Sequence, residues 1–331
     1  ATRIGLNRTL QIGLTLQIIA IAMLAVDPSV LSLLYVMLAQ ALSGVAKDLN
    51  KMSAKSSIKL LVAEDQQSTL YRWVAILTGS KNTLKGLGFF LGGGLMTLFG
   101  FRGGLIFMMA LLITTLIITW GRLQSSTNHY KPKFSKVLSK STRINLLSGA
   151  RFFLFGSRDI WFVIALPVFL QTQLSWTHVQ VGGFMASWVI AYGMVQALTP
   201  NITGSRNHSL SGLAPWLWAT GLALIPASIA LCLFLGINPT LSLVIGLLVY
   251  GAVFAINSSI HSYLIIAYAE SDSVSTDVGF YYMANAAGRL AGTLLSGIIY
   301  QQYGLESCLI VSSLMVILSA IIATRLPRAI S

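Results

Sequence analysis

Long apolar segments make up most of this 331-residue chain, and they constrain its fold more than any other feature. A helix needs about 20 apolar residues to cross the ~30 Å hydrocarbon core of a bilayer. We predict about ten such spans, at roughly 10–26, 30–52, 73–98, 103–120, 146–173, 180–199, 215–236, 240–266, 277–301 and 306–326. Charged residues are only 9% of the chain, far fewer than in soluble domains. The chain is therefore predicted to be an all-α integral membrane protein.

Cationic side chains inside these apolar segments are the second constraint, and they are Lys47, Lys51, Lys81, Lys85, Arg151, Arg158 and Arg289. Only Asp48 and Asp159 lie among them to balance the charge. One cation at mid-bilayer costs about 2.5–3.5 kcal/mol, so seven facing lipid would cost roughly 15–25 kcal/mol. We expect them instead to line a polar cavity inside the protein. The excess of positive charge favours an anion as the ligand of that cavity.

Basic residues outside the spans indicate orientation rather than nucleic-acid binding, although the formal net charge is +13. One set of loops holds nearly all of them, whereas the opposite loops hold only Arg102. This asymmetry predicts that both ends of the sequence face the cytoplasm, across the cell (inner) membrane. The lysine-rich segment 124–143 is expected to be a cytoplasmic linker. It would join four spans of an N-terminal bundle, 1–123, to a six-helix C-terminal bundle, 144–331.

An internal repeat relates the two predicted bundles. A shift of 204 residues places Lys85 on Arg289, and it places Gly88, Gly93 and Gly100 on Gly292, Gly297 and Gly304. Corresponding spans of a transporter with parallel repeats should match in this way, at the same depth. Glycines in apolar helices can also coincide by chance, and this alternative stays open.

The lysines occur at helical spacing. Lys47 and Lys51 lie one turn apart, and Asp48 can pair with Lys51 at i,i+3. Further along the same stripe, Lys55 and Lys59 are expected to reach towards anionic lipid headgroups. In the 73–98 span, Lys81 and Lys85 are again four residues apart, and we expect both to face the cavity.

The arginines suit oxyanions, because the planar guanidinium binds such groups bidentately and keeps its charge when desolvated. Arg151 and Arg158 are seven residues apart and share a helix face, whereas Asp159 is turned by about 100°. Asp159 would either neutralise Arg158, pair with a lysine, or couple transport to protons. In the 277–301 span, Asn285 and Arg289 share a face.

The predicted anion site therefore consists of Lys47, Lys51, Lys81, Lys85, Arg151, Arg158, Asn285 and Arg289. The candidates for proton coupling are Asp48, Asp159 and His261, and for His261 a hydrogen-bonded contact between helices is favoured over a proton relay. Nothing in the sequence indicates a metal cluster, a nucleotide-binding loop or a nucleophile triad, so we predict no enzyme activity and no cofactor. A gradient would have to drive transport.

The opening residues, 1–9, resemble the second half of a cytoplasmic motif of major facilitator transporters, which joins their second and third helices. Thr2 stands where that motif has an acid, which weakens any inference about its salt bridge. The resemblance implies a major facilitator fold of six plus six helices, with the first two helices missing from this sequence.

Four further stretches, 43–56, 78–86, 156–161 and 285–292, look like those of the ArsJ-type organoarsenical efflux permeases. That resemblance implies export of 1-arseno-3-phosphoglycerate, arsenate resistance, and a functional link to a glyceraldehyde-3-phosphate dehydrogenase. The other expected partner is membrane lipid, with no nucleic acid, and the protein is expected to be a monomer. The alternatives are an organophosphate/phosphate antiporter, a multidrug exporter and a non-transporting membrane sensor.

Overall fold

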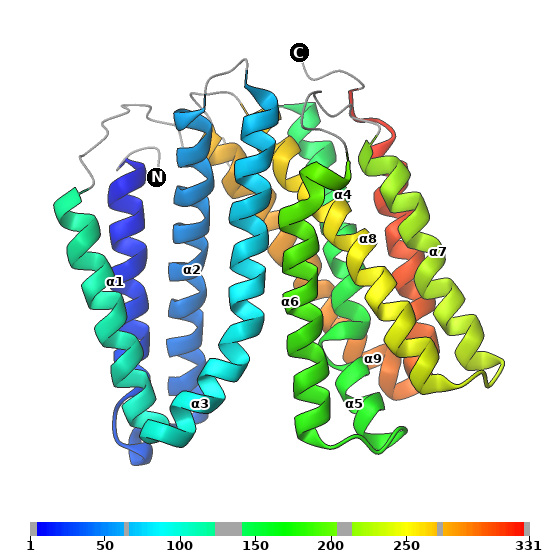
Figure 1. Ribbon diagram of the computed structural model, residues 1–331, viewed down its shortest axis with the longest axis horizontal. Helices are drawn as coiled ribbons and strands as arrows, with labels where there is room; N and C mark the ends of the chain where they lie inside the picture. Colours follow the sequence, from blue (N-terminus) through cyan, green and yellow to red (C-terminus); the bar gives the residue numbers. More distant parts are fainter. Residues whose placement is uncertain (1–4, 63–65, 123–140, 204–213, 270–273, 328–331) are drawn as a thin grey trace. The chain divides into compact units, whose positions relative to one another are not determined.

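The computed structural model describes residues 5–62, 66–122, 141–203, 214–269 and 274–327, and every regular element among them is helical (Figure 1). In chain order the elements are α1 (Leu6–Leu24), the short 3-10 helix η1 (Pro28–Val30), α2 (Leu33–Leu61), α3 (Gln67–Arg122), α4 (Thr142–Phe162), α5 (Ala165–Thr172), α6 (His178–Ile202), α7 (Ala214–Phe234), α8 (Pro239–Tyr268) and α9 (Val274–Ala323). The prediction of an all-α chain is confirmed for these residues. Most of the predicted linker, 124–143, lies outside them.

Seven helical segments within the described ranges are long and apolar enough to cross a membrane. They are Leu6–Leu24, Gln67–Gly121, Thr142–Thr172, His178–Ile202, Pro215–Phe234, Pro239–Tyr268 and Val274–Ala323. The helix α2, which has five charged residues from Lys47 to Lys59, is not one of the seven. The count of about ten spans and the two missing helices therefore stay predictions.

Two of these segments are about twice the length that a single crossing needs. At about 1.5 Å per residue, the 56 residues of α3 and the 50 of α9 far exceed the ~30 Å hydrocarbon core. Each contains one break, at Gly100 (φ 67°) and at Gly304 (φ 78°), in a region that favours glycine. Beyond the second break the chain doubles back, and the Cys308 thiol lies 3.9 Å from the Ser296 carbonyl. The two breaks are separated by the 204-residue shift of the predicted repeat.

Two predicted spans differ from the observed helices. The helix α2 continues to Leu61, nine residues past the predicted end at residue 52, so the whole lysine stripe is helical. The predicted span 146–173 is divided into α4 and α5, because Pro167 has no N–H and its ring clashes with the carbonyl four residues earlier. The amide of Ala165 instead donates to the Ser296 hydroxyl, at 3.2 Å.

The described residues form two compact units. The first comprises parts of 1–61, 88–137 and 270–278, and the second parts of 62–87, 138–269 and 279–331. In the first unit α1 packs along α2, where the Ser53 hydroxyl donates to the Leu6 carbonyl at 2.6 Å. The early part of α3 thus belongs to the same unit as α4 to α8. The predicted division into 1–123 and 144–331 stays a prediction.

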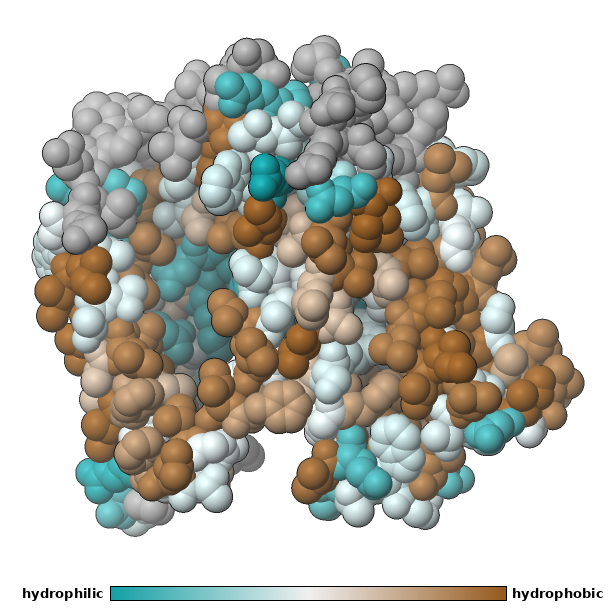
Figure 2. Space-filling view, in the orientation of Figure 1, coloured by the Kyte–Doolittle hydropathy of each residue, from teal (hydrophilic) through white to brown (hydrophobic). Residues whose placement is uncertain are grey.

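Aromatic side chains form much of the core of the second unit. The ring of Trp161 packs edge-on against Tyr250, with centroids 5.1 Å apart, and the Trp188 indole donates to the Leu247 carbonyl at 2.7 Å. Apolar residues cover the outer faces of α7 and α8, at the right of Figure 2, while hydrophilic residues lie near the helix ends. Such a surface suits contact with lipid.

Candidate functional site

A close crossing of α4 and α9 positions the arginine side chains. A methyl group added to Gly156 would lie only 3.0 Å from the Gly288 carbonyl, and one added to Gly292 would overlap the Gly156 carbonyl. Small residues let two helix backbones approach in this way. Because Arg158 and Arg289 each lie within two residues of these glycines, the crossing brings the two side chains together.

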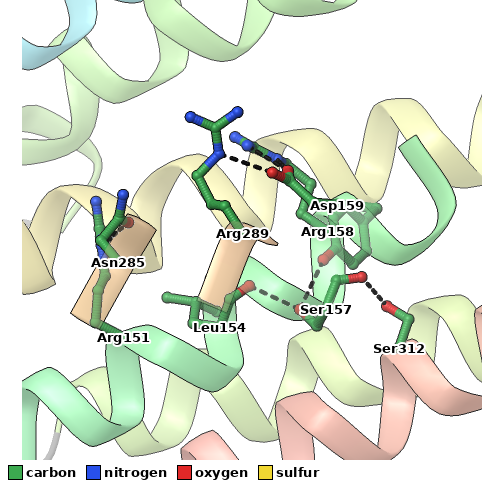
Figure 3. A network of polar contacts seen from close by, with 9 residues as sticks. Arg151, Leu154, Ser157, Arg158, Asp159, Asn285, Arg289 and Ser312 are labelled. Carbon is green, nitrogen blue, oxygen red and sulfur yellow. Dashed lines mark hydrogen bonds and ion pairs between the residues drawn. The ribbon is translucent and has the colours of Figure 1, made fainter. Parts of the chain in front are cut away.

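The Asp159 carboxylate lies between these two arginines. Its Oδ1 accepts from Nε of Arg158 at 2.7 Å, and its Oδ2 accepts from Nε of Arg289 at 2.7 Å (Figure 3). The carboxylate is fully buried, whereas the side chain of Arg158 is 13% exposed and that of Arg289 is 43% exposed. The rest of the Arg289 guanidinium points away from the carboxylate in Figure 3. Of the pairings that the sequence left open, the one with Arg158 is confirmed; the second partner is an arginine and not a lysine.

Arg151 is the buried end of the same cluster. Its Nε donates to Oδ1 of Asn285 at 3.0 Å, and its Nη1 donates to the Ser258 carbonyl at 3.1 Å and hydroxyl at 3.0 Å. The guanidinium carbon also lies 3.7 Å from the centroid of the Phe155 ring. Three guanidiniums and one carboxylate leave the cluster with a net charge of +2. An anion is the ligand that such a cluster can bind.

Hydrogen bonds continue from this cluster to α3. Gln196 on α6 donates to the Ser258 hydroxyl and to the Tyr192 hydroxyl, each at 3.1 Å. Its carbonyl oxygen accepts from the Asn82 amide of α3 at 2.6 Å. Gln196 was not predicted from the sequence, although an amide deep in the apolar helix His178–Ile202 is a signal that could have indicated it. The polar contacts thus join α3, α6, α8, α4 and α9.

Lys81 and Lys85 lie on the part of α3 that belongs to the same compact unit. That part packs on α6 through Gly79 and Gly86, where an added methyl group would lie within 2.8 Å of the α6 backbone. At about 100° per residue, the two lysines are turned by more than about 100° from this packed side. Both are exposed. Six of the eight predicted anion-binding residues therefore belong to one compact unit.

The remaining two, Lys47 and Lys51, lie on α2 in the other unit. Lys51 Nζ lies 2.6 Å from Oδ1 of Asp48, which confirms the predicted i,i+3 pair. Lys47 and Asp48 are exposed. Lys55 is buried, however, so the expectation that it reaches lipid headgroups is wrong. The reason is that α2 remains a packed helix beyond residue 52, as the neighbouring Ser53 contact to α1 shows.

His261 on α8 is fully buried. Neither ring nitrogen has a hydrogen-bond partner among the described residues. The favoured interpretation as a hydrogen-bonded helix contact is therefore wrong for the described residues. Its candidate role in proton coupling stays a prediction.

The described residues are those of a helical membrane protein that has several apolar spans and a net positive polar cluster between them. The family model described as Major Facilitator Superfamily matches residues 1–276, and the chain belongs to that superfamily. This confirms the superfamily inferred from the opening motif, and it makes the protein a transporter. No curated protein sequence matches the chain.

Solved structures support the fold. The human organic anion transporter MFSD10 (TETRAN) has 17% sequence identity and a TM-score of 0.77, with 97% of this chain and 78% of that chain covered. A bacterial homologue of the iron transporter ferroportin has 14% identity and a TM-score of 0.74, covering 97% and 83%. The E. coli fucose:proton symporter FucP has 11% identity and a TM-score of 0.70, covering 98% and 84%. At such identities the likeness concerns the fold alone.

Proposed function

We propose that this transporter exports a small phosphorylated organic anion by alternating access. The observation that carries the proposal is the excess of guanidinium over carboxylate where α4 crosses α9, with the far end of Arg289 still accessible. A phosphoryl group would bind that end of Arg289 together with Arg158, since two arginines can hold one oxyanion through several charge-assisted hydrogen bonds.

The direction of transport has an energetic basis. An anion that leaves a cell with a negative interior gains about 2.3 kcal/mol per charge for each 100 mV of membrane potential. A doubly charged phosphoryl compound would thus move outward without a further energy source. Asp48, Asp159 and His261 remain the candidates for coupling this movement to protons.

Of these three candidates, Asp159 has the clearest mechanism. Its carboxylate and an incoming anion would compete for the same guanidinium groups, because Arg158 and Arg289 both bind it. Binding of the anion would therefore displace the Asp159 carboxylate from one or both arginines, which is why Asp159 is the candidate that we favour.

The particular substrate that we propose is 1-arseno-3-phosphoglycerate, on the strength of the resemblance to ArsJ-type permeases. This molecule carries an oxyanion at each end, so it needs two cationic groups of residues. The arginines on α4 and α9 would bind one end, and Lys81 and Lys85 of the same compact unit are the candidates for the other. The human neighbour is described as an organic anion transporter, but at 17% identity it supports only the fold.

The test uses the full-length natural protein in arsenate-sensitive cells and in proteoliposomes. Co-expression with an arsenate-using glyceraldehyde-3-phosphate dehydrogenase should confer arsenate resistance, whereas the dehydrogenase alone should not. No gain in resistance would refute the arsenical substrate. In proteoliposomes, labelled glycerol 3-phosphate should move outward, and stimulation by external phosphate would identify an antiporter instead. No movement of any organic phosphate would refute the wider proposal.

A further inference from the structure

A polar segment of α8 is enclosed by protein on every side. Each residue from 256 to 263 is at most 6% exposed, and five of the eight are polar. Ser258 accepts hydrogen bonds from Arg151 and Gln196, and the Ser259 hydroxyl donates to the Gln196 carbonyl at 3.3 Å. Of the three serines on this segment, Ser258 contacts α4 and α6, and Ser259 contacts α6.

Asn257 and His261 differ from these serines. Both side chains are fully buried and lie one helical turn apart on the same face of α8. No atom of the Asn257 amide and neither nitrogen of the His261 ring has a hydrogen-bond partner among the described residues. A buried polar group without a partner costs about 1–3 kcal/mol. Two adjacent side chains with four such atoms indicate a site that gains its partners from a ligand.

The pair lies beside the arginine cluster. At about 100° per residue, His261 is turned only about 60° from Ser258, which binds Arg151, and Asn257 directly precedes that serine. The unpaired amide and imidazole therefore lie next to the side of α8 that faces Arg151. A ligand held by the arginines would place its other atoms within reach of this side of the helix.

We propose that Asn257 and His261 form a second subsite, which binds the hydroxyl or carbonyl oxygens of the organic anion. An amide and a neutral imidazole each offer both a donor and an acceptor, which complements a hydroxyl group. The arginines bind the charged phosphoryl group, and because they only donate they cannot accept the proton of a hydroxyl group. This subsite rests on the proposed function. It would make the transporter prefer organic phosphates that carry a hydroxyl group over those that carry none.

The experiment compares two probes of equal charge and similar length, glycerol 3-phosphate and n-propyl phosphate, in proteoliposomes of the full-length protein. A site built to hydrogen-bond a hydroxyl group rejects an analogue that lacks it. The wild type should therefore prefer glycerol 3-phosphate by about tenfold or more in kcat/KM. Asn257→Leu should reduce this preference while transport of propyl phosphate persists, and His261→Leu should also reduce the preference. The matched control is Ser259→Ala, which removes a buried polar group from the same segment and should leave the preference unchanged.

The possible outcomes separate the two proposals. If the wild type moves both probes equally well, the subsite is wrong whatever the variants do, and the anion exporter stands. An unchanged preference in Asn257→Leu and His261→Leu would also overturn it and leave these side chains bound only to internal water. If either leucine variant fails to fold, His261→Gln, which keeps a donor and an acceptor, should retain the preference. If the wild type moves neither probe, both proposals fail.

Discussion

The cations of α2 and those of α4 and α9 look alike in the sequence but have different surroundings in the structure. Lys51 pairs with Asp48 one turn away on its own helix, and Asp48 is more than half exposed. Asp159 is fully buried and joins an arginine of α4 to an arginine of α9. A local pair of this kind depends on one helix, whereas the arginine cluster exists only where two helices cross.

This difference indicates what each region contributes. Exposed ion pairs contribute about 0–1 kcal/mol, because water and salt screen them. Breaking a buried pair costs about 3–5 kcal/mol, since it leaves a charge without compensation. The arginine cluster should therefore dominate both stability and anion binding, and four substitutions test this comparison.

The largest expected effect on transport is that of Arg289→Ala. This change removes the most accessible guanidinium of the cluster, and loss of a charge-assisted contact to an oxyanion costs about 2–3 kcal/mol, or roughly a hundredfold in kcat/KM. Transport of labelled glycerol 3-phosphate in proteoliposomes measures it. The control is Lys47→Ala, which should cost much less. If both variants lost transport equally, the two cationic regions would contribute equally to anion binding.

Asp159→Leu should have the largest effect on stability. It leaves Arg158 and Arg289 without their shared carboxylate, and because Arg289 is 43% exposed we expect a loss of about 2–4 kcal/mol. Thermal unfolding in detergent measures the change. Asp159→Asn retains the shape and hydrogen-bonding oxygen, so it should lose less. If Asp159→Leu unfolds at the wild-type temperature, the carboxylate does not hold α4 and α9 together.

Gly292→Leu tests the crossing itself. A side chain at this position would collide with the Gly156 carbonyl, and forcing atoms into a packed contact costs about 1–3 kcal/mol. We expect a lower unfolding temperature and weaker transport, because the arginines would move apart. The matched change, Gly221→Leu on α7, meets no atom within 4 Å and should be tolerated. Normal transport by Gly292→Leu would show that the close approach is not required.

The smallest effect is expected for Asp48→Asn. Loss of the ion pair with Lys51 should lower the free energy of unfolding by at most about 1 kcal/mol. At high salt the variant and the wild type should differ even less, because salt screens the pair. Thermal unfolding at low and high ionic strength measures this. A loss as large as that of Asp159→Leu would remove the distinction between the two regions.

The sequence alone determined the helical class, the position of each cation and the local pair of Lys51 with Asp48. Each depends on apolar length or on the spacing of residues within one helix, which the order of residues sets. The match of Gly100 with Gly304 at a shift of 204 residues was also visible in the sequence, although the helix breaks at these glycines were not predicted.

Only the tertiary structure decided which groups meet across helices. It placed Asp159 between two arginines, buried Lys55, introduced Gln196 as a link to Asn82, and left His261 without a partner among the described residues. These outcomes depend on how each helix is rotated and how closely it packs, as at the crossing of Gly156 and Gly292. Spacing along a chain does not carry that information, because contacts between distant segments arise from packing.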